Sequence, residues 1–141
     1  MIKKKVPVKV TLKTTMEQDG QQETFAFEED GEFIALNDKY YLRYLEHQNG
    51  QTTPVQFRLD DGEVHIHRQG ATETWLVFDP SQPTITRYRT AYGIMQLQVV
   101  TSRLEWELDP AVPAGRLSLS YRLRGGGQEI GSYQIELHFT A

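Results

Sequence analysis

The sequence contains no cysteine, so disulfide bonds and thiolate metal sites are excluded. It also lacks any run approaching the roughly 18 apolar residues that a membrane-spanning helix requires. No apolar core or small-residue cleavage site follows the basic residues after Met1, so we expect no signal peptide. A chain without cysteine suits a reducing compartment, and we therefore expect a cytoplasmic protein that does not bind a membrane.

Clustered positive charge and catalytic motifs are also missing. The net charge is −4, and charges of both signs alternate along the chain, so we expect no nucleic-acid partner. There is no Gly-x-Ser-x-Gly elbow, and the triple glycine at residues 125–127 lacks the lysine of a phosphate-binding loop. We therefore predict no catalytic residue and no cofactor. The length of 141 residues fits one domain over residues 1–141.

Alternation of apolar and polar residues is the dominant pattern. Val6, Val8 and Val10 share one face of an extended segment, while Lys9 and Thr11 share the other. The pattern returns along the chain and predicts an all-β protein of about ten short strands. The twelve segments that read as strand lie at residues 6–12, 24–27, 32–36, 39–47, 55–59, 64–68, 74–78, 84–90, 94–101, 104–108, 117–123 and 133–139.

Turn residues separate these segments every 8–12 residues, as in all-β sandwiches and barrels. Asp30-Gly31 reads as a break between strands, and Gly93 as a break or bulge. Because nearly every connection is short, we expect consecutive strands to pair antiparallel. The predicted fold is an antiparallel up-and-down barrel, which leaves no exposed edge if it closes.

The histidines could belong to a metal site. His65 and His67 share one strand face, and Glu63 on that face or His47 from another strand could supply a third ligand. Val64 and Ile66 occupy the opposite, more core-like face. We therefore predict outward-facing surface histidines and no metal site.

Polar residues on otherwise apolar faces are the candidate ligand-binding residues. Arg68 continues the Val64–Ile66 face, and Tyr44 and Glu46 continue the Leu42 face. A charged side chain inside a barrel must find a partner, so Glu46 is expected to pair with Arg68, with tyrosine hydroxyls nearby. The set can be a pocket for a polar or anionic ligand, or an ion pair that plugs one end. The candidate set is Tyr44, Glu46, Arg68 and Tyr88.

The two tryptophans, Trp75 and Trp106, lie within predicted strands. Such residues usually pack in the core, and that is the role expected here, with ligand stacking as the alternative.

Several segments together resemble the YwiB family of small, uncharacterised β-barrel proteins from Gram-positive bacteria. The similarity runs from near residue 6 to near residue 139. It implies a calycin-like (lipocalin-like) barrel of eight to ten strands and no established activity. The lipocalin Gly-x-Trp signature near the N-terminus is missing, so the resemblance does not transfer lipocalin ligands. The segments that carry it are Tyr41-Leu42-x-Tyr44-x-Glu46, residues 62–70, the strand from Trp75 to Phe78, and residues 84–93, which include Tyr88 and Gly93.

The sequence leaves three functions open. The first is non-enzymatic binding of a small amphipathic or anionic ligand in the barrel, with Arg68 as the charge anchor. The second is a structural or protein-interaction module with a filled barrel, either a monomer or a homodimer. The third, less favoured, is a hydrolase with Glu46 as base and Arg68 as the oxyanion contact.

Overall fold

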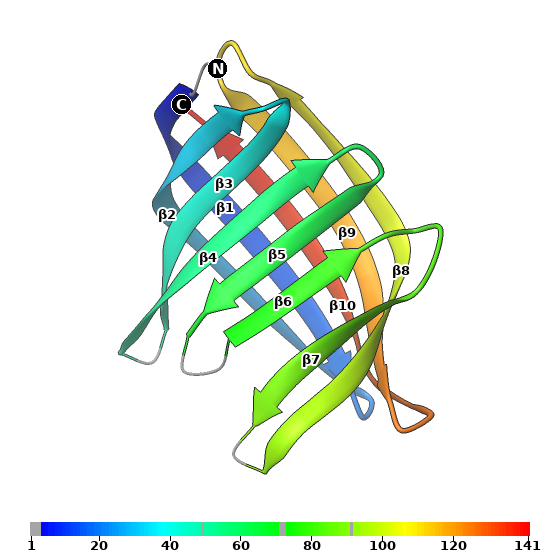
Figure 1. Ribbon diagram of the computed structural model, residues 1–141. Helices are drawn as coiled ribbons and strands as arrows, with labels where there is room; N and C mark the ends of the chain where they lie inside the picture. The colour runs from blue at the N-terminus through cyan, green and yellow to red at the C-terminus, as the bar shows by residue number, and fades with distance from the viewer. Residues whose placement is uncertain (1–3, 49, 71–72, 91) are drawn as a thin grey trace.

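The computed structural model describes residues 4–48, 50–70, 73–90 and 92–141 (Figure 1). All regular structure in these residues is β-strand, so none of them forms a helix that could span a membrane. The ten strands are β1 (Lys4–Gln18), β2 (Gln21–Leu36), β3 (Lys39–Gln48), β4 (Gln51–Asp60), β5 (Glu63–Gln69), β6 (Glu73–Phe78), β7 (Thr84–Thr90), β8 (Gly93–Asp109), β9 (Ala114–Gly125) and β10 (Gln128–Thr140).

The strands form one antiparallel sheet in the order β6-β5-β4-β3-β2-β1-β10-β9-β8-β7. The first and last strands pair along Lys9–Glu17 and Ser132–Thr140, which brings the two ends of the chain together. The sheet curls into a nearly closed barrel (Figure 1). The predicted all-β, antiparallel, calycin-like barrel is confirmed.

Two predicted breaks between strands are wrong. Residues 24–27 and 32–36 belong to one continuous strand, β2, in which Gly31 lies opposite Tyr44 of β3. A Cβ atom at Gly31 would lie 2.6 Å from the carbonyl oxygen of Arg43, so this glycine allows close approach of two strands rather than a turn. Residues 94–101 and 104–108 likewise form one strand, β8, with a bulge between Thr101 and Arg103.

Consecutive strands pair antiparallel as expected, except at the boundary between β6 and β7, which we call the seam. No backbone ladder joins the described residues of these two strands. Instead, the Thr84 hydroxyl donates to the Val77 carbonyl at 2.5 Å, and the Thr86 hydroxyl donates to the Trp75 carbonyl at 2.5 Å. The barrel therefore closes through side chains at this one boundary.

Apolar side chains fill much of the interior. Alternate residues of each strand point inward, and Phe33, Phe57 and Phe78 are almost completely buried among them. Aromatic contacts cross the barrel: the rings of Tyr40 on β3 and Trp106 on β8 lie 6.5 Å apart, centroid to centroid. Each buried large apolar side chain contributes roughly 1.5–3 kcal/mol to folding. This packing leaves the polar inward-facing residues concentrated toward one end.

Candidate functional site

The inward-facing polar residues predicted from the sequence lie at the end of the barrel where β3 runs into β4. Leu42, Tyr44 and Glu46 alternate on the inner face of β3, and Ile66 and Arg68 do so on β5. The two strands flank β4, so side chains at their ends meet across one intervening strand. We call this region, which contains Tyr44, Glu46 and Arg68, the polar end.

Glu46 and Arg68 form the expected ion pair, and its geometry is bidentate. Arg68 Nη1 donates to Glu46 Oε2 at 2.9 Å, and Nη2 donates to Oε1 at 2.6 Å. The Glu46 side chain is 12% exposed, whereas that of Arg68 is 37% exposed. The bond to Glu46 raises the pKa of Arg68, with burial acting in the opposite direction. The guanidinium is thus held by two hydrogen bonds, while part of the side chain stays reachable from solvent.

Two buried tyrosines lie beside this pair. Burial raises the pKa of Tyr44 well above its ordinary value; the Glu46 charge adds to the rise and Arg68 opposes it. Burial likewise raises the pKa of Tyr121 on β9, with a contribution from Tyr133 and an opposing one from Arg68. Both hydroxyls therefore stay protonated and uncharged next to the guanidinium.

Sequence reasoning missed Tyr121 and Tyr133. Their rings stack with centroids 4.9 Å apart, and the Tyr121 ring also lies 4.6 Å from that of Phe78 on β6. The signal was available, because Tyr121 alternates with Leu119 and Leu123 on an inner face. Nothing local indicated that β9 would lie across the barrel from β5.

The fourth predicted residue, Tyr88, lies on β7 opposite Met95 of β8. Its backbone position on β7 is two residues after the buried Thr86. Its side chain lies outside the part of the chain that the structure describes. The structure thus brings together Tyr44, Glu46 and Arg68, and the role of Tyr88 stays a prediction.

Both carboxylate oxygens of Glu46 accept hydrogen bonds from Arg68. A general base needs an oxygen lone pair directed at the substrate proton, whereas both oxygens of Glu46 are directed at Arg68. The geometry therefore supports binding or closure of the barrel better than hydrolysis.

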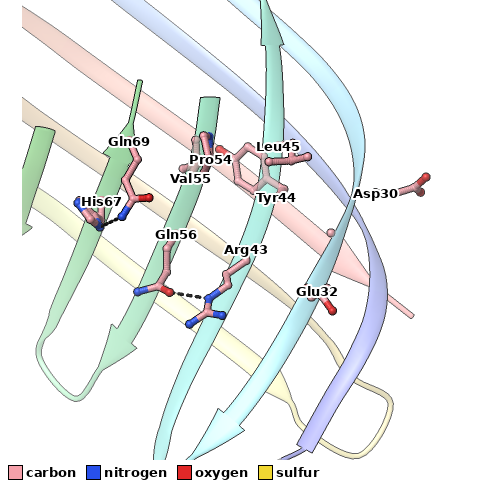
Figure 2. Close-up of a pocket in the computed structure, with 11 residues that line it drawn as sticks. Asp30, Glu32, Arg43, Tyr44, Leu45, Pro54, Val55, Gln56, His67 and Gln69 are labelled. Carbon is pink, nitrogen blue, oxygen red and sulfur yellow. Dashed lines mark hydrogen bonds between the residues drawn. The ribbon is translucent and has the colours of Figure 1, made fainter. Parts of the chain in front are cut away.

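A separate hollow of about 660 Å³ lies on the outer side of the sheet, where β2 diverges from β3 beyond the Gly31–Tyr44 pair. We call it the outer groove (Figure 2). Arg43 and Gln56 are cross-strand neighbours within it, and Arg43 Nε donates to Gln56 Oε1 at 2.6 Å. The side chains that shape it are Asp30, Glu32, Arg43, Leu45, Gln56, His67 and Gln69.

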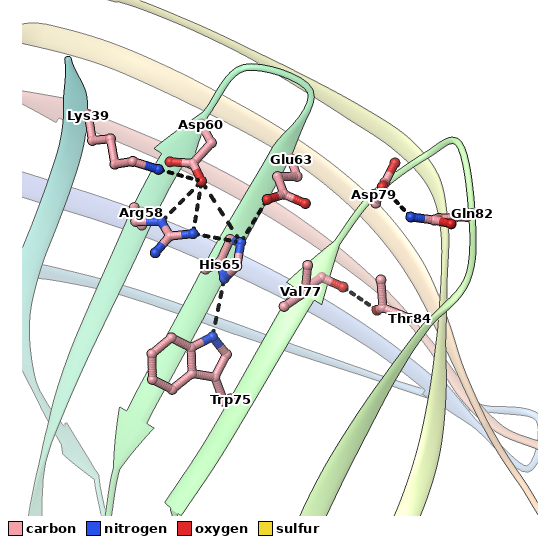
Figure 3. A network of polar contacts seen from close by, with 10 residues as sticks. All are labelled: Lys39, Arg58, Asp60, Glu63, His65, Trp75, Val77, Asp79, Gln82 and Thr84. Atoms are coloured by element: carbon pink, nitrogen blue, oxygen red, sulfur yellow. Dashed lines mark hydrogen bonds and ion pairs between the residues drawn. The ribbon is translucent and has the colours of Figure 1, made fainter. Parts of the chain in front are cut away.

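The predicted outward histidines are confirmed, and His65 belongs to a dense polar network (Figure 3). Asp60, Glu63 and His65 have potential ligand atoms within 4.8 Å of one another. However, both ring nitrogens of His65 already contact protein groups, because the Trp75 indole donates to Nδ1 at 3.2 Å and Nε2 lies 3.1 Å from Glu63 Oε1. A metal ion would have to displace one of these contacts.

The Arg58 guanidinium contacts two members of this cluster. Its Nη2 atom lies 2.9 Å from Asp60 Oδ2 and 3.0 Å from His65 Nε2. These contacts describe a network of ion pairs and hydrogen bonds on the outer face, and the absence of a metal there stays a prediction.

Trp75 takes part in this outer face, and the core role expected for it is wrong. Its side chain is 48% exposed and its ring lies 4.6 Å from that of His67. On β6 it alternates with Leu76 and Phe78, which point inward. Trp106, in contrast, packs against the core as expected.

A ten-stranded antiparallel meander that is filled with apolar side chains and polar at one end defines a small calycin-like β-barrel protein. The chain belongs to the family described as "Domain of unknown function (DUF1934)", which it matches over residues 10–137. It is 28% identical over 137 residues to the "Uncharacterized beta-barrel protein YwiB" of Bacillus subtilis (strain 168), covering 97% of this chain and 92% of that protein.

The fold is shared as well. The crystal structure of ywiB protein from Bacillus subtilis superposes with a TM-score of 0.84 at 25% identity, over 97% of this chain and 92% of the other. The resemblance to the YwiB family is therefore confirmed. The relatives carry no stated activity, so function rests on the geometry of this chain.

Proposed function

We propose that this protein is a non-enzymatic binding protein that takes a small amphipathic or anionic ligand at the polar end of the barrel. The observation that carries the proposal is the half-exposed Arg68, held by a bidentate contact with the less exposed Glu46. A guanidinium fixed in this way offers its remaining donors to a carboxylate or phosphate at little entropic cost.

The surroundings of Arg68 suit an amphipathic molecule. Tyr44 and Tyr121 combine apolar ring surface with an uncharged hydroxyl, and their rings continue into the apolar core through Phe57 and Phe78. Because the core is filled, the ligand's apolar part would lie against these rings at the mouth rather than deep inside the barrel. A binding site of this kind needs few polar contacts to orient its ligand.

A paired substitution separates binding from a structural plug. We expect a thermal-shift screen against fatty acids, nucleotides and phosphorylated metabolites to give at least one hit. The Arg68→Gln variant should lose it, and Glu46→Gln should bind it more tightly because the arginine charge is no longer neutralised. Each variant should lose about 1–2 kcal/mol of stability, less than a fully buried pair would cost, because Arg68 reaches solvent.

The matched control is the exposed pair of Arg116 and Glu107, whose Nε and Oε1 atoms lie 2.6 Å apart. Its Gln variants make the same charge changes away from the polar end and should leave binding unchanged. If no compound shifts the melting temperature of the wild type or of Glu46→Gln, the pair is a plug and the proposal fails.

An interaction module is the second candidate, favoured by exposed apolar residues on the β7–β8 hairpin. Ile85 and Ile94 share its outer face and are 55% and 65% exposed, and the hairpin projects from one end of the barrel (Figure 1). The occupant would be a second copy of the chain. Light scattering should then show a dimer that Ile94→Lys converts to a monomer, and a monomeric wild type would eliminate this candidate.

A further inference from the structure

One row of side chains crosses the outer face of the sheet from β2 to β6. Successive cross-strand pairs join Glu32 to Arg43, Arg43 to Gln56, Gln56 to His67, and His67 to Trp75. Residues paired in this way lie within contact distance on one face. The middle of the row lines the outer groove of about 660 Å³, and Trp75 stands directly beyond it.

Arg43 forms no ion pair with a carboxylate of the described residues, although Glu32 is its cross-strand neighbour. Its side chain hydrogen-bonds to a neutral amide: Nε donates to Gln56 Oε1 at 2.6 Å (Figure 2). Because Nε is occupied, the guanidinium is oriented and its two terminal nitrogens present the edge that binds an oxyanion through two parallel hydrogen bonds. Arg68, on the other face of the sheet, has that same edge occupied by Glu46.

The acidic residues at the rim of the groove are already paired on the side away from Arg43. Lys5 Nζ lies 3.1 Å from Glu32 Oε2, and Lys9 Nζ lies 2.8 Å from Asp30 Oδ1, both lysines coming from β1. Their charges largely cancel at the rim. Among the described residues that line the groove, Arg43 is therefore the cation placed to act on a ligand.

The rest of the groove suits a ligand whose remaining part, beyond the anionic group, is polar and uncharged. Gln56 keeps its amide nitrogen as a donor, Leu45 supplies exposed apolar surface, and Trp75 continues the platform beside His67. His67 is held in place by Glu73, 2.8 Å from its Nε2 atom, so the platform is ordered before a ligand arrives. Mixed apolar surface with a few oriented polar groups is typical of small-molecule sites.

We propose that the outer groove is a second ligand site, independent of the polar end, which binds a phosphate or carboxylate group on a polar, uncharged body through Arg43 and Gln56. The site lies on the outer face of strands β2–β5, whereas the polar end lies inside the barrel. An experiment that rules out one site therefore leaves the other untouched. Its anchor, Arg43, is an exposed residue, so substitution there should not disturb folding.

The test is a titration of the intact protein with inorganic phosphate, citrate and glucose 6-phosphate at constant ionic strength, followed by Trp fluorescence and calorimetry. We expect glucose 6-phosphate or citrate to bind with a Kd of about 1 mM. A ligand concentration of about 10 mM, ten times that Kd, should then nearly saturate the site. Arg43→Gln should weaken binding at least about tenfold, the cost of one charge-assisted contact. Gln56→Leu should weaken it less, because it removes only the group that orients Arg43.

Two control variants complete the test. Arg116→Gln makes the same change in net charge on β9, and Arg68→Gln removes the anchor of the polar end; neither should change binding in the groove. Trp75→Phe should abolish the fluorescence response while calorimetric binding persists. If none of the three probes binds, or if Arg43→Gln binds them as tightly as Arg116→Gln does, the groove is not an oxyanion site.

Discussion

Two arginines on opposite faces of the same sheet differ in the partner that holds the guanidinium group. Arg68 points into the barrel and is neutralised by both oxygens of Glu46. Arg43 points outward and is oriented by the neutral amide of Gln56. A paired guanidinium keeps only the donors that its partner leaves free, while an oriented and unpaired one can present a whole edge to an anion.

The buried tyrosines Tyr44 and Tyr121 predict a loss of stability at alkaline pH. Burial raises the pKa of both in the folded protein, whereas in the unfolded chain each titrates at about 10. Above that pH the unfolded chain loses protons that the folded protein keeps, so the free energy of unfolding falls as pH rises. The free energy of unfolding should fall by about 1.4 kcal/mol per pH unit for each tyrosine. Below about pH 10 both states keep the proton, so the contribution of each tyrosine does not change with pH.

Urea unfolding from about pH 9 to about pH 11 measures this slope. The double variant with Tyr44→Phe and Tyr121→Phe should lose less stability over this range than the wild type does. Equal slopes in the two proteins would show that these hydroxyls do not control alkaline unfolding.

At the level of elements, the seam between β6 and β7 is the weakest boundary of the sheet. Every other neighbouring pair is joined by a backbone ladder, but here two threonine hydroxyls make the link. The loop before β7 ends in Pro83, which has no N–H to donate. The strands meet antiparallel as in a hairpin, yet they do not share a ladder.

Replacing the seam threonines by valine keeps their shape and removes the two hydrogen bonds. We expect Thr84→Val and Thr86→Val each to cost about 1 kcal/mol, because each leaves a β6 carbonyl without its donor. Hydrogen exchange should accelerate in β6 before other strands, since the seam opens first. Thr11→Val, at an exposed position of β1, is the control and should change neither quantity. Uniform acceleration in all strands would contradict a local seam.

At the level of the whole molecule, contacts across the barrel make it one cooperative unit. Phe78 on β6 packs against Tyr121 on β9, and Tyr40 on β3 packs against Trp106 on β8. These contacts join strands that are distant in the sheet order. A core continuous in this way should unfold in a single transition.

The completely buried Phe78 tests this cooperativity. Phe78→Ala should destabilise the protein by about 3–5 kcal/mol, the sum of lost burial and a residual cavity. Far-UV circular dichroism and Trp fluorescence should still report one coincident transition. The partly exposed Phe25 provides the control, and its Ala variant should cost much less. Separate transitions for the two probes would show that the seam side of the barrel unfolds independently.

Period-two alternation let the sequence by itself determine which faces of β3 and β5 enter the core. It placed Tyr44, Glu46 and Arg68 inside and His65 and His67 outside, and the structure confirms both placements. The Glu46–Arg68 pair could be predicted because a buried charge requires a partner. These inferences succeed because strand geometry and desolvation act on each residue locally.

Only the tertiary structure decided which strands meet and where the sheet stops pairing. Tyr121 reaches the polar end because β9 lies across the barrel, and the outer groove exists because β2 and β3 diverge beyond Gly31. Trp75 lies outside because its register on β6 pairs it with His67. Register, curvature and closure depend on contacts between residues far apart in the chain, and alternation along one strand carries no information about them.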